Sequence, residues 1–182
     1  MRWLLLLLGG VLLGGIVHLA TVMMVPRTAT QDAYARLAQN APVNTVVQVP
    51  PPPPGQAVLT FMDPAFAVAV CRYDLSQGSL KFSVPVSQAY TSATFYTRYD
   101  VAYYAINDRA AGRRVIELDL MTPEQRAQLP EDEDVTAADR LIVESPTATG
   151  LIAVRALAPE PGLMPMARAS LQAAKCAVQP HP

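Results

Sequence analysis

The hydrophobic pattern changes twice along the chain, and it is most uniform at the start. Residues 3–25 form an apolar run without a charged side chain. As a helix, which rises about 1.5 Å per residue, this run is long enough to cross a hydrocarbon core of roughly 30 Å. A cleavable signal peptide has a shorter apolar core, of about 7–15 residues. The pattern therefore favours an uncleaved transmembrane anchor over residues 1–26, ended by Pro26, which cannot continue a helix.

The next segment, residues 27–56, predicts a juxtamembrane helix followed by a proline-rich linker. Thr30 is a suitable cap for a short helix over residues 28–40. After it, the sequence VPPPPPG at 49–55 cannot lie inside a helix or a central strand. Polyproline II extends about 3.1 Å per residue, so the proline run predicts a semi-rigid spacer of roughly 15 Å between the anchor and a folded domain. A ligand for an SH3-like module is the alternative interpretation of the same run.

From residue 57 to residue 182 apolar and polar positions alternate, which is typical of half-buried strands. Strands are predicted over residues 58–63, 65–75, 79–85, 90–98, 101–107, 115–121, 139–145 and 150–157. Two helices are expected in addition: a short one capped by Thr122, and a C-terminal one over residues 162–178. Strands at this spacing predict a mainly β fold, with a β-sandwich-like domain that carries a short helix and a C-terminal helix.

Composition and charge restrict where the protein can be located and which classes of partner it can bind. The chain has 182 residues with a formal net charge of −1, which provides no basic face for a nucleic acid. Arg2 precedes the apolar run and Arg27 follows it, so the positive-inside rule alone decides little. A short N-terminus before a long apolar run is typical of a signal anchor. We therefore expect a bacterial single-pass protein of the inner (cytoplasmic) membrane, embedded in the lipid bilayer, with its C-terminal domain in the periplasm.

Catalytic chemistry has few candidates in the predicted domain. Of the two histidines, His18 lies in the apolar run and His181 in the last two residues. This argues against histidine triads and most zinc sites within the fold. The acidic run at 131–134 lacks the glycine and the spaced ligands of a calcium loop. We therefore predict no catalytic residue, no metal and no cofactor.

Tyrosines crowd one region of the predicted sheets: Tyr90, Tyr96, Tyr99, Tyr103 and Tyr104. They could form the floor of a cleft for an apolar or sugar ligand. Packing in the core is the alternative, although a buried tyrosine needs a partner for its hydroxyl group. A cleft would favour the interpretation of the protein as an envelope enzyme, whereas core packing would favour no particular function.

The two cysteines, Cys71 in a predicted strand and Cys176 in the predicted C-terminal helix, are a disulfide candidate. An exported chain with two cysteines often joins them. Such a bond would close a loop of about 100 residues and would hold the C-terminal helix against the sheet. Two buried free thiols are the alternative.

One face of the predicted anchor carries Gly10, Gly14 and His18, which recur every four residues. Glycines at this spacing let a second helix approach closely, and a polar residue on the same face can hydrogen-bond across the contact. The pattern indicates a helix–helix contact in the membrane.

Four different short motifs follow one another from residue 63 to residue 157. An acidic residue precedes a strand, a DLS-x-G turn follows that strand, a Val-Pro pair ends the next one, and a late strand ends in Arg-x-Leu. The residues are Asp63, Asp74, Leu75, Ser76, Gly78, Val84, Pro85, Arg155 and Leu157. Together they resemble the domain-of-unknown-function 1254 family. Two positions depart from its pattern: Phe61 replaces an asparagine, and Tyr90 is what remains of a tyrosine pair.

The resemblance implies no established reaction. It implies that longer members continue into a second β-rich domain, of the 1214 type, which would follow the end of this chain. We therefore expect a binding or scaffolding module whose missing half comes from another membrane-anchored protein, held through the face of Gly10, Gly14 and His18. An envelope enzyme with a tyrosine-rich cleft is the alternative.

Overall fold

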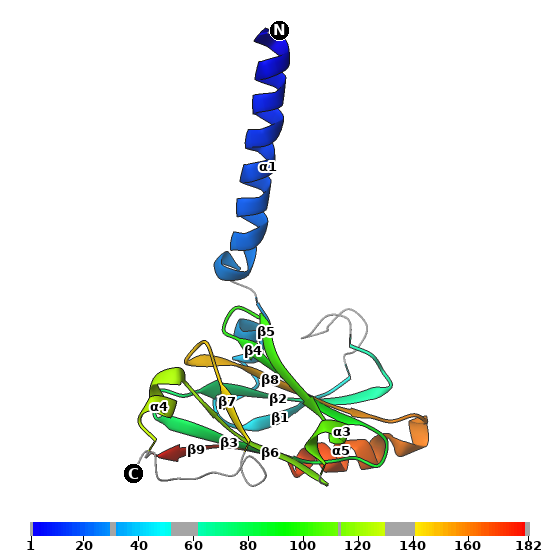
Figure 1. The fold of residues 1–182 in the computed structure, drawn as a ribbon. Helices are drawn as coiled ribbons and strands as arrows, with labels where there is room; N and C mark the ends of the chain where they lie inside the picture. Colours follow the sequence, from blue (N-terminus) through cyan, green and yellow to red (C-terminus); the bar gives the residue numbers. More distant parts are fainter. Residues whose placement is uncertain (1, 30–31, 52–61, 113, 130–140, 181–182) are drawn as a thin grey trace.

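The structure is a computed structural model that describes residues 2–29, 32–51, 62–112, 114–129 and 141–180. Figure 1 shows a long N-terminal helix that stands apart from a domain built of two β-sheets. The acidic run at 131–134 and most of the strand predicted over 58–63 lie outside the described residues, and the two described residues of that strand, Met62 and Asp63, are not in a strand.

Helix α1 (Arg2–Thr28) buries none of its residues against the domain. By its length and composition it can cross a membrane. The prediction that Pro26 ends the helix is wrong, because the helix continues through it to Thr28. Pro26 removes a single backbone donor near the helix end, and the Ala29 amide still donates to the Val25 carbonyl at 3.0 Å.

The domain consists of two sheets joined by short helices. The five-stranded sheet has the order β1 (Val46–Val49), β2 (Phe66–Asp74), β8 (Thr149–Leu157), β4 (Thr91–Thr97) and β5 (Ala102–Asn107). The four-stranded sheet has the order β7 (Ile142–Glu144), β6 (Val115–Met121), β3 (Gly78–Pro85) and β9 (Lys175–Pro180). Neighbouring strands are antiparallel except for β6 and β7, which are parallel.

The helices of the domain are short and lie between strands. They are α2 (Ala33–Leu37), α3 (Asp108–Ala111), α4 (Pro123–Ala127), the 3-10 helix η1 (Pro161–Leu163) and α5 (Met164–Gln172). Helix α4 begins as predicted. The Oγ1 atom of Thr122 accepts a hydrogen bond from the Gln125 amide, and Gln125 Oε1 accepts one from the Thr122 amide.

The two sheets enclose one apolar core. In β3, Leu80, Phe82 and Val84 are buried while Lys81 between them is exposed, as the predicted alternation requires. Phe82 meets Phe95 of β4 edge to face, with 5.7 Å between the ring centroids. These two strands belong to opposite sheets, so the predicted β-sandwich is confirmed.

In the sequence, the proline run follows β1 and precedes β2. Strand β1 pairs with β2, from Val46 opposite Cys71 to Val49 opposite Val68. The prediction of a linker is therefore wrong at β1, and the prolines that follow connect two neighbouring strands instead of spacing the anchor from the domain. Sequence pattern could not find β1, because all four of its residues are half-buried and none alternates with an exposed one.

The C-terminal helix is shorter than predicted. Helix α5 ends at Gln172, and β9 then pairs with β3, with Lys175 opposite Ser83. Pro165 lies in the first turn of α5, where a proline is tolerated. Pairing with the open edge of β3 overrides the helical spacing of the residues after Gln172. Cys176 is therefore on a strand, and its prediction as a helical residue is wrong.

Candidate functional site

The residues that follow α1 fold back onto the outer face of the five-stranded sheet. Leu37 of α2 and Ala41 after it are buried against Val68 and Val70 of β2 and Leu151 of β8. The domain therefore has a second, smaller apolar cluster outside the sandwich core. This cluster attaches the juxtamembrane residues to the sheet.

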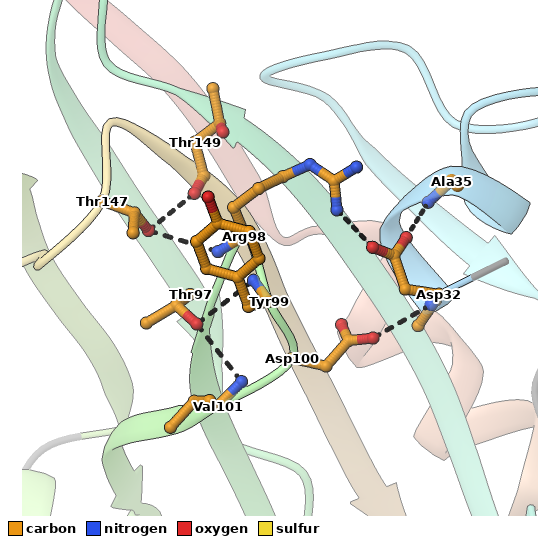
Figure 2. A network of polar contacts seen from close by, with 10 residues as sticks. Asp32, Ala35, Thr97, Arg98, Tyr99, Asp100, Val101, Thr147 and Thr149 are labelled. Carbon is orange, nitrogen blue, oxygen red and sulfur yellow. Dashed lines mark hydrogen bonds and ion pairs between the residues drawn. The ribbon is translucent and has the colours of Figure 1, made fainter. Parts of the chain in front are cut away.

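Polar contacts at the start of α2 strengthen this attachment (Figure 2). Asp32 caps the helix, because its Oδ1 accepts from the Ala35 amide at 2.7 Å, while its Oδ2 pairs with Arg98. The predicted cap, Thr30, lies outside the described residues. Asp100 Oδ2 accepts from the Ala33 amide at 3.1 Å. The side chain of Asp32 is 5% exposed, so this ion pair is shielded from solvent on the aspartate side.

A stacked aromatic completes the attachment. The ring of Tyr34 lies between two guanidinium groups, Arg72 at 4.3 Å and Arg98 at 4.4 Å from the ring centroid. Arg72 also donates to the carbonyl of Ala41 at 3.1 Å. We call Asp32, Tyr34, Arg72, Arg98 and Asp100 the juxtamembrane latch, because they hold the chain next to α1 against β2 and the β4–β5 turn.

The β4–β5 turn is itself rigidly held. Thr97 Oγ1 accepts from the amides of Tyr99 and Val101, at 3.3 and 3.2 Å (Figure 2). The Arg98 amide donates to Thr147 Oγ1, which ties the turn to the loop before β8. Asp100 has a left-handed backbone, with φ of 58°. The latch residues at the start of α2 therefore contact a turn whose shape is fixed by its own hydrogen bonds.

Asp100 makes the stability of the latch depend on pH. Burial raises the pKa of its carboxyl group above the ordinary value, and the hydrogen bond from the Ala33 amide only partly offsets this. A carboxyl group whose pKa is raised by folding contributes stability at low pH that is lost as the pH rises through the folded-state pKa. Ionised Asp100 therefore weakens the folded state at neutral pH.

We expect Asp100→Asn to be at least as stable as the natural protein at neutral pH and to flatten the change of melting temperature between about pH 4 and pH 7. Asparagine keeps an acceptor oxygen for the Ala33 amide and tolerates a left-handed backbone. Thermal unfolding of the detergent-solubilised full chain at a series of pH values measures this. A variant that melts below the natural protein at neutral pH would contradict it.

A buried cluster of hydroxyl groups closes one end of the core. The Tyr73 hydroxyl lies 2.9 Å from Ser145 Oγ, 3.2 Å from the Tyr103 hydroxyl and 3.0 Å from the Tyr96 carbonyl. Burial raises the pKa of Tyr103, so its hydroxyl stays protonated. The cluster is a satisfied structural network. The sequence analysis missed Tyr73, although a tyrosine within a predicted strand needs a partner for its hydroxyl group when it is buried.

The five predicted tyrosines do not share one surface. Tyr96 packs against the outer apolar cluster, whereas Tyr103 and Tyr104 pack against the sandwich core, with ring centroids 6.4 and 5.7 Å from that of Phe95. Tyr90 meets Phe66 edge to face, and Tyr99 is exposed on the β4–β5 turn. Their burial follows the alternative of core packing more closely than that of a cleft.

The remaining predicted residues are the two cysteines and the glycine face of α1. Cys71 of β2 and Cys176 of β9 are joined by a disulfide bond, with 6.5 Å between their Cα atoms. Because these strands belong to different sheets, the bond crosses the sandwich. On α1, a Cβ atom added at Gly10 or Gly14 would meet no atom within 4 Å. The face that includes His18 is therefore bare in this chain.

A groove of about 480 Å³ lies between the end of β1, the start of β2 and α5. Its described lining is mainly apolar, with Val49, Phe66 and Met164 as examples and exposed Arg168 beside them. The groove can take an apolar group, but its described lining has no buried polar side chain to orient a ligand. Among the described residues, no three His, Cys, Asp or Glu side chains are grouped to hold a metal ion.

Comparison with known proteins identifies the domain. Residues 43–178 match the family described as "Protein of unknown function (DUF1254)". The chain belongs to the DUF1254 family. The resemblance predicted from residues 63–155 is thereby confirmed, and the match also covers β1 and most of β9.

Two crystal structures of longer proteins align with this chain, and the first of them shows the same fold for its DUF1254 domain. The VPA0106 protein from Vibrio parahaemolyticus aligns with a TM-score of 0.59 and 13% identity, over 81% of this chain and 34% of that one. An uncharacterised protein from Burkholderia cenocepacia aligns with a TM-score of 0.47 and 11% identity, over 75% of this chain and 34% of that one. The chain thus spans about a third of their length. No curated protein matches this sequence.

Three motif residues of the DUF1254 resemblance shape the turns at the two ends of β2. Asp63 Oδ1 accepts from the Ala65 amide, and Asp74 Oδ1 accepts from the Ser76 amide, both at 2.9 Å. Gly78 has a φ of 145°, which few other residues adopt. These positions shape the start and end of β2 and do not make a reactive site.

Proposed function

We propose that this DUF1254 protein is held in the inner membrane by α1, displays its β-sandwich in the periplasm, and acts there as a binding or scaffolding module without a reaction of its own. The juxtamembrane latch is the observation that carries this proposal. It fixes the residues just after α1 to the sandwich through Asp32, Arg98 and Asp100. A domain attached in this way is presented at a set distance from the membrane.

Two further features support the location. Helix α1 has the length and composition of a membrane span. The disulfide bond between Cys71 and Cys176 suits an oxidising compartment, such as the bacterial periplasm, better than the cytoplasm.

The proposed partner is a second membrane-anchored protein, with a 1214-type domain as the candidate. Relatives of known structure are about three times as long as the matched part, so a DUF1254 sandwich can occur beside further folded chain. The bare face of Gly10, Gly14 and His18 offers a place for another helix. Two proteins anchored in one bilayer have a raised effective concentration, so a weak contact between their outer domains is sufficient.

Substitution on the glycine face tests the partner. We expect Gly14→Ile to reduce co-purification of membrane proteins with the tagged full chain by about tenfold, because the larger side chain prevents close approach of a helix. Gly15→Ile is the matched control, since it lies about 100° around the helix from Gly14. Quantitative mass spectrometry after mild detergent extraction measures the yield. Equal recovery of the same proteins with both variants would mean that this face contacts only lipid.

A further inference from the structure

The tip of the β4–β5 turn exposes two large apolar side chains. We call residues 99–101 the hairpin tip. Tyr99 is 41% exposed and Val101 is 52% exposed. Outside α1, the described large apolar residues with comparable exposure are Val43, Tyr99, Val101, Val115 and Met166. Two of these five therefore share one three-residue segment, and the hydrogen bonds that its amides donate to Thr97 Oγ1 hold that segment in place.

The hairpin tip lies close to the membrane end of the chain. The Ala29 amide still bonds to Val25, so the helical path of α1 extends to Ala29. From Ala29 the chain advances by three residues to Asp32, and this advance spans at most about 11 Å. Asp32 is paired with Arg98, and the Ala33 amide donates to Asp100. Tyr99 lies between the latch residues Arg98 and Asp100 in the sequence, so covalent tethering keeps the hairpin tip near the end of α1.

This reach matches the depth of the lipid headgroups. The apolar run at 3–25 is about 34 Å long as a helix, slightly longer than a hydrocarbon core of roughly 30 Å. The headgroup layer adds about 5–8 Å on each side. With the apolar run centred in the bilayer, Ala29 lies about 8 Å beyond the hydrocarbon core, near the outer edge of this layer, and the latch lies within about 11 Å of Ala29. Figure 1 shows the β4–β5 end of the domain facing the foot of α1.

We infer that the hairpin tip rests in the headgroup layer of the bilayer that α1 spans, with Tyr99 and Val101 in contact with lipid. This inference rests on the proposed membrane anchoring. Tyrosine suits the interface because its ring is apolar and its hydroxyl group can remain hydrated. Beside the tip, Arg98 is paired with Asp32. Within the tip, the Asp100 carboxyl group accepts a hydrogen bond from the Ala33 amide, so it turns toward the chain and not only toward the lipid.

Tryptophan fluorescence in brominated vesicles tests the contact. The natural chain has one tryptophan, Trp3. The full chain is reconstituted into phosphatidylcholine and phosphatidylglycerol vesicles, with or without bromine high on the acyl chains. One variant combines Trp3→Phe with Tyr99→Trp. The matched control combines Trp3→Phe with Met166→Trp, because Met166 is about as exposed but lies on α5.

We expect bromination to lower the emission of the probe at position 99 by about twofold and to leave the probe at position 166 nearly unchanged. Equal emission changes at the two positions, with Trp3 of the natural chain quenched, would overturn the inference while the membrane anchor stands. An unquenched Trp3 would overturn the anchor and the inference with it. The probe at position 99 could be shielded from water in native membranes but not in pure lipid vesicles. That result would assign the tip to a protein partner and would also overturn the inference.

Discussion

Replacing Gly150 with alanine is expected to destabilise the domain by roughly 3–5 kcal/mol, among the largest effects that one methyl group can have. Gly150 lies in β8 between Tyr73 of β2 and Thr97 of β4. An added Cβ atom would lie 2.2 Å from the Tyr73 hydroxyl oxygen and 2.3 Å from the Tyr96 carbonyl oxygen. The carbonyl belongs to a central strand and cannot move aside without breaking the sheet. The hydroxyl is fixed by its contacts to Ser145 and Tyr103.

Denaturant unfolding of the detergent-solubilised full chain measures this effect. Gly162→Ala is the matched control, because a Cβ atom there would meet nothing within 4 Å. Adding Tyr73→Phe to Gly150→Ala should recover only part of the loss, since the clash with the Tyr96 carbonyl and with the ring carbon of residue 73 remains. A Gly150→Ala variant as stable as the Gly162→Ala control would show that β2, β8 and β4 pack less tightly than described.

Reducing the disulfide bond is expected to lower the free energy of unfolding by about 3–5 kcal/mol. Cys71 and Cys176 are 105 residues apart in sequence, so the bond removes much of the conformational freedom of the unfolded chain. In the folded state it attaches β9, at the edge of the four-stranded sheet, to β2 in the opposite sheet. We expect β9 to be the first element to lose its protection against amide hydrogen exchange after reduction.

Unfolding curves with and without reductant measure the loss, and the Cys71→Ala/Cys176→Ala variant controls for other effects of the reductant. Thiol labelling of the unfolded protein should occur only after reduction. Equal labelling in both conditions would show two free thiols, which is the alternative that the sequence left open.

The sequence predicted those elements whose patterns are local. The apolar run of α1, the alternation in β3 and the cap at Thr122 each carry their signal within a few residues, and the structure contains all three. The strands β1 and β9 have no such signal. They are short edge strands whose conformation depends on β2 and β3, which are distant from them in the chain.

The candidate site was harder to predict than the fold. Asp32 and Arg98 are 66 residues apart in sequence, and neither lies in a motif. Tyr34 lies in the short helix expected after the anchor, yet its ring contacts two arginines that come from β2 and the β4–β5 turn. Contacts of this kind depend on which strands become neighbours, and this information is absent from hydrophobic periodicity.

The path by which the chain enters the domain limits how far tension from α1 can extend the chain. A force that draws the sandwich away from α1 acts first on the juxtamembrane latch, and then on the hydrogen bonds between β1 and β2. Extension along the chain then reaches Cys71, which is opposite Val46 in the same strand pair. Beyond that residue, the disulfide bond to Cys176 closes the polypeptide into a covalent loop that tension from α1 cannot extend. The segment between α1 and Cys71 can therefore extend under load, whereas the residues between Cys71 and Cys176 stay within the covalent loop.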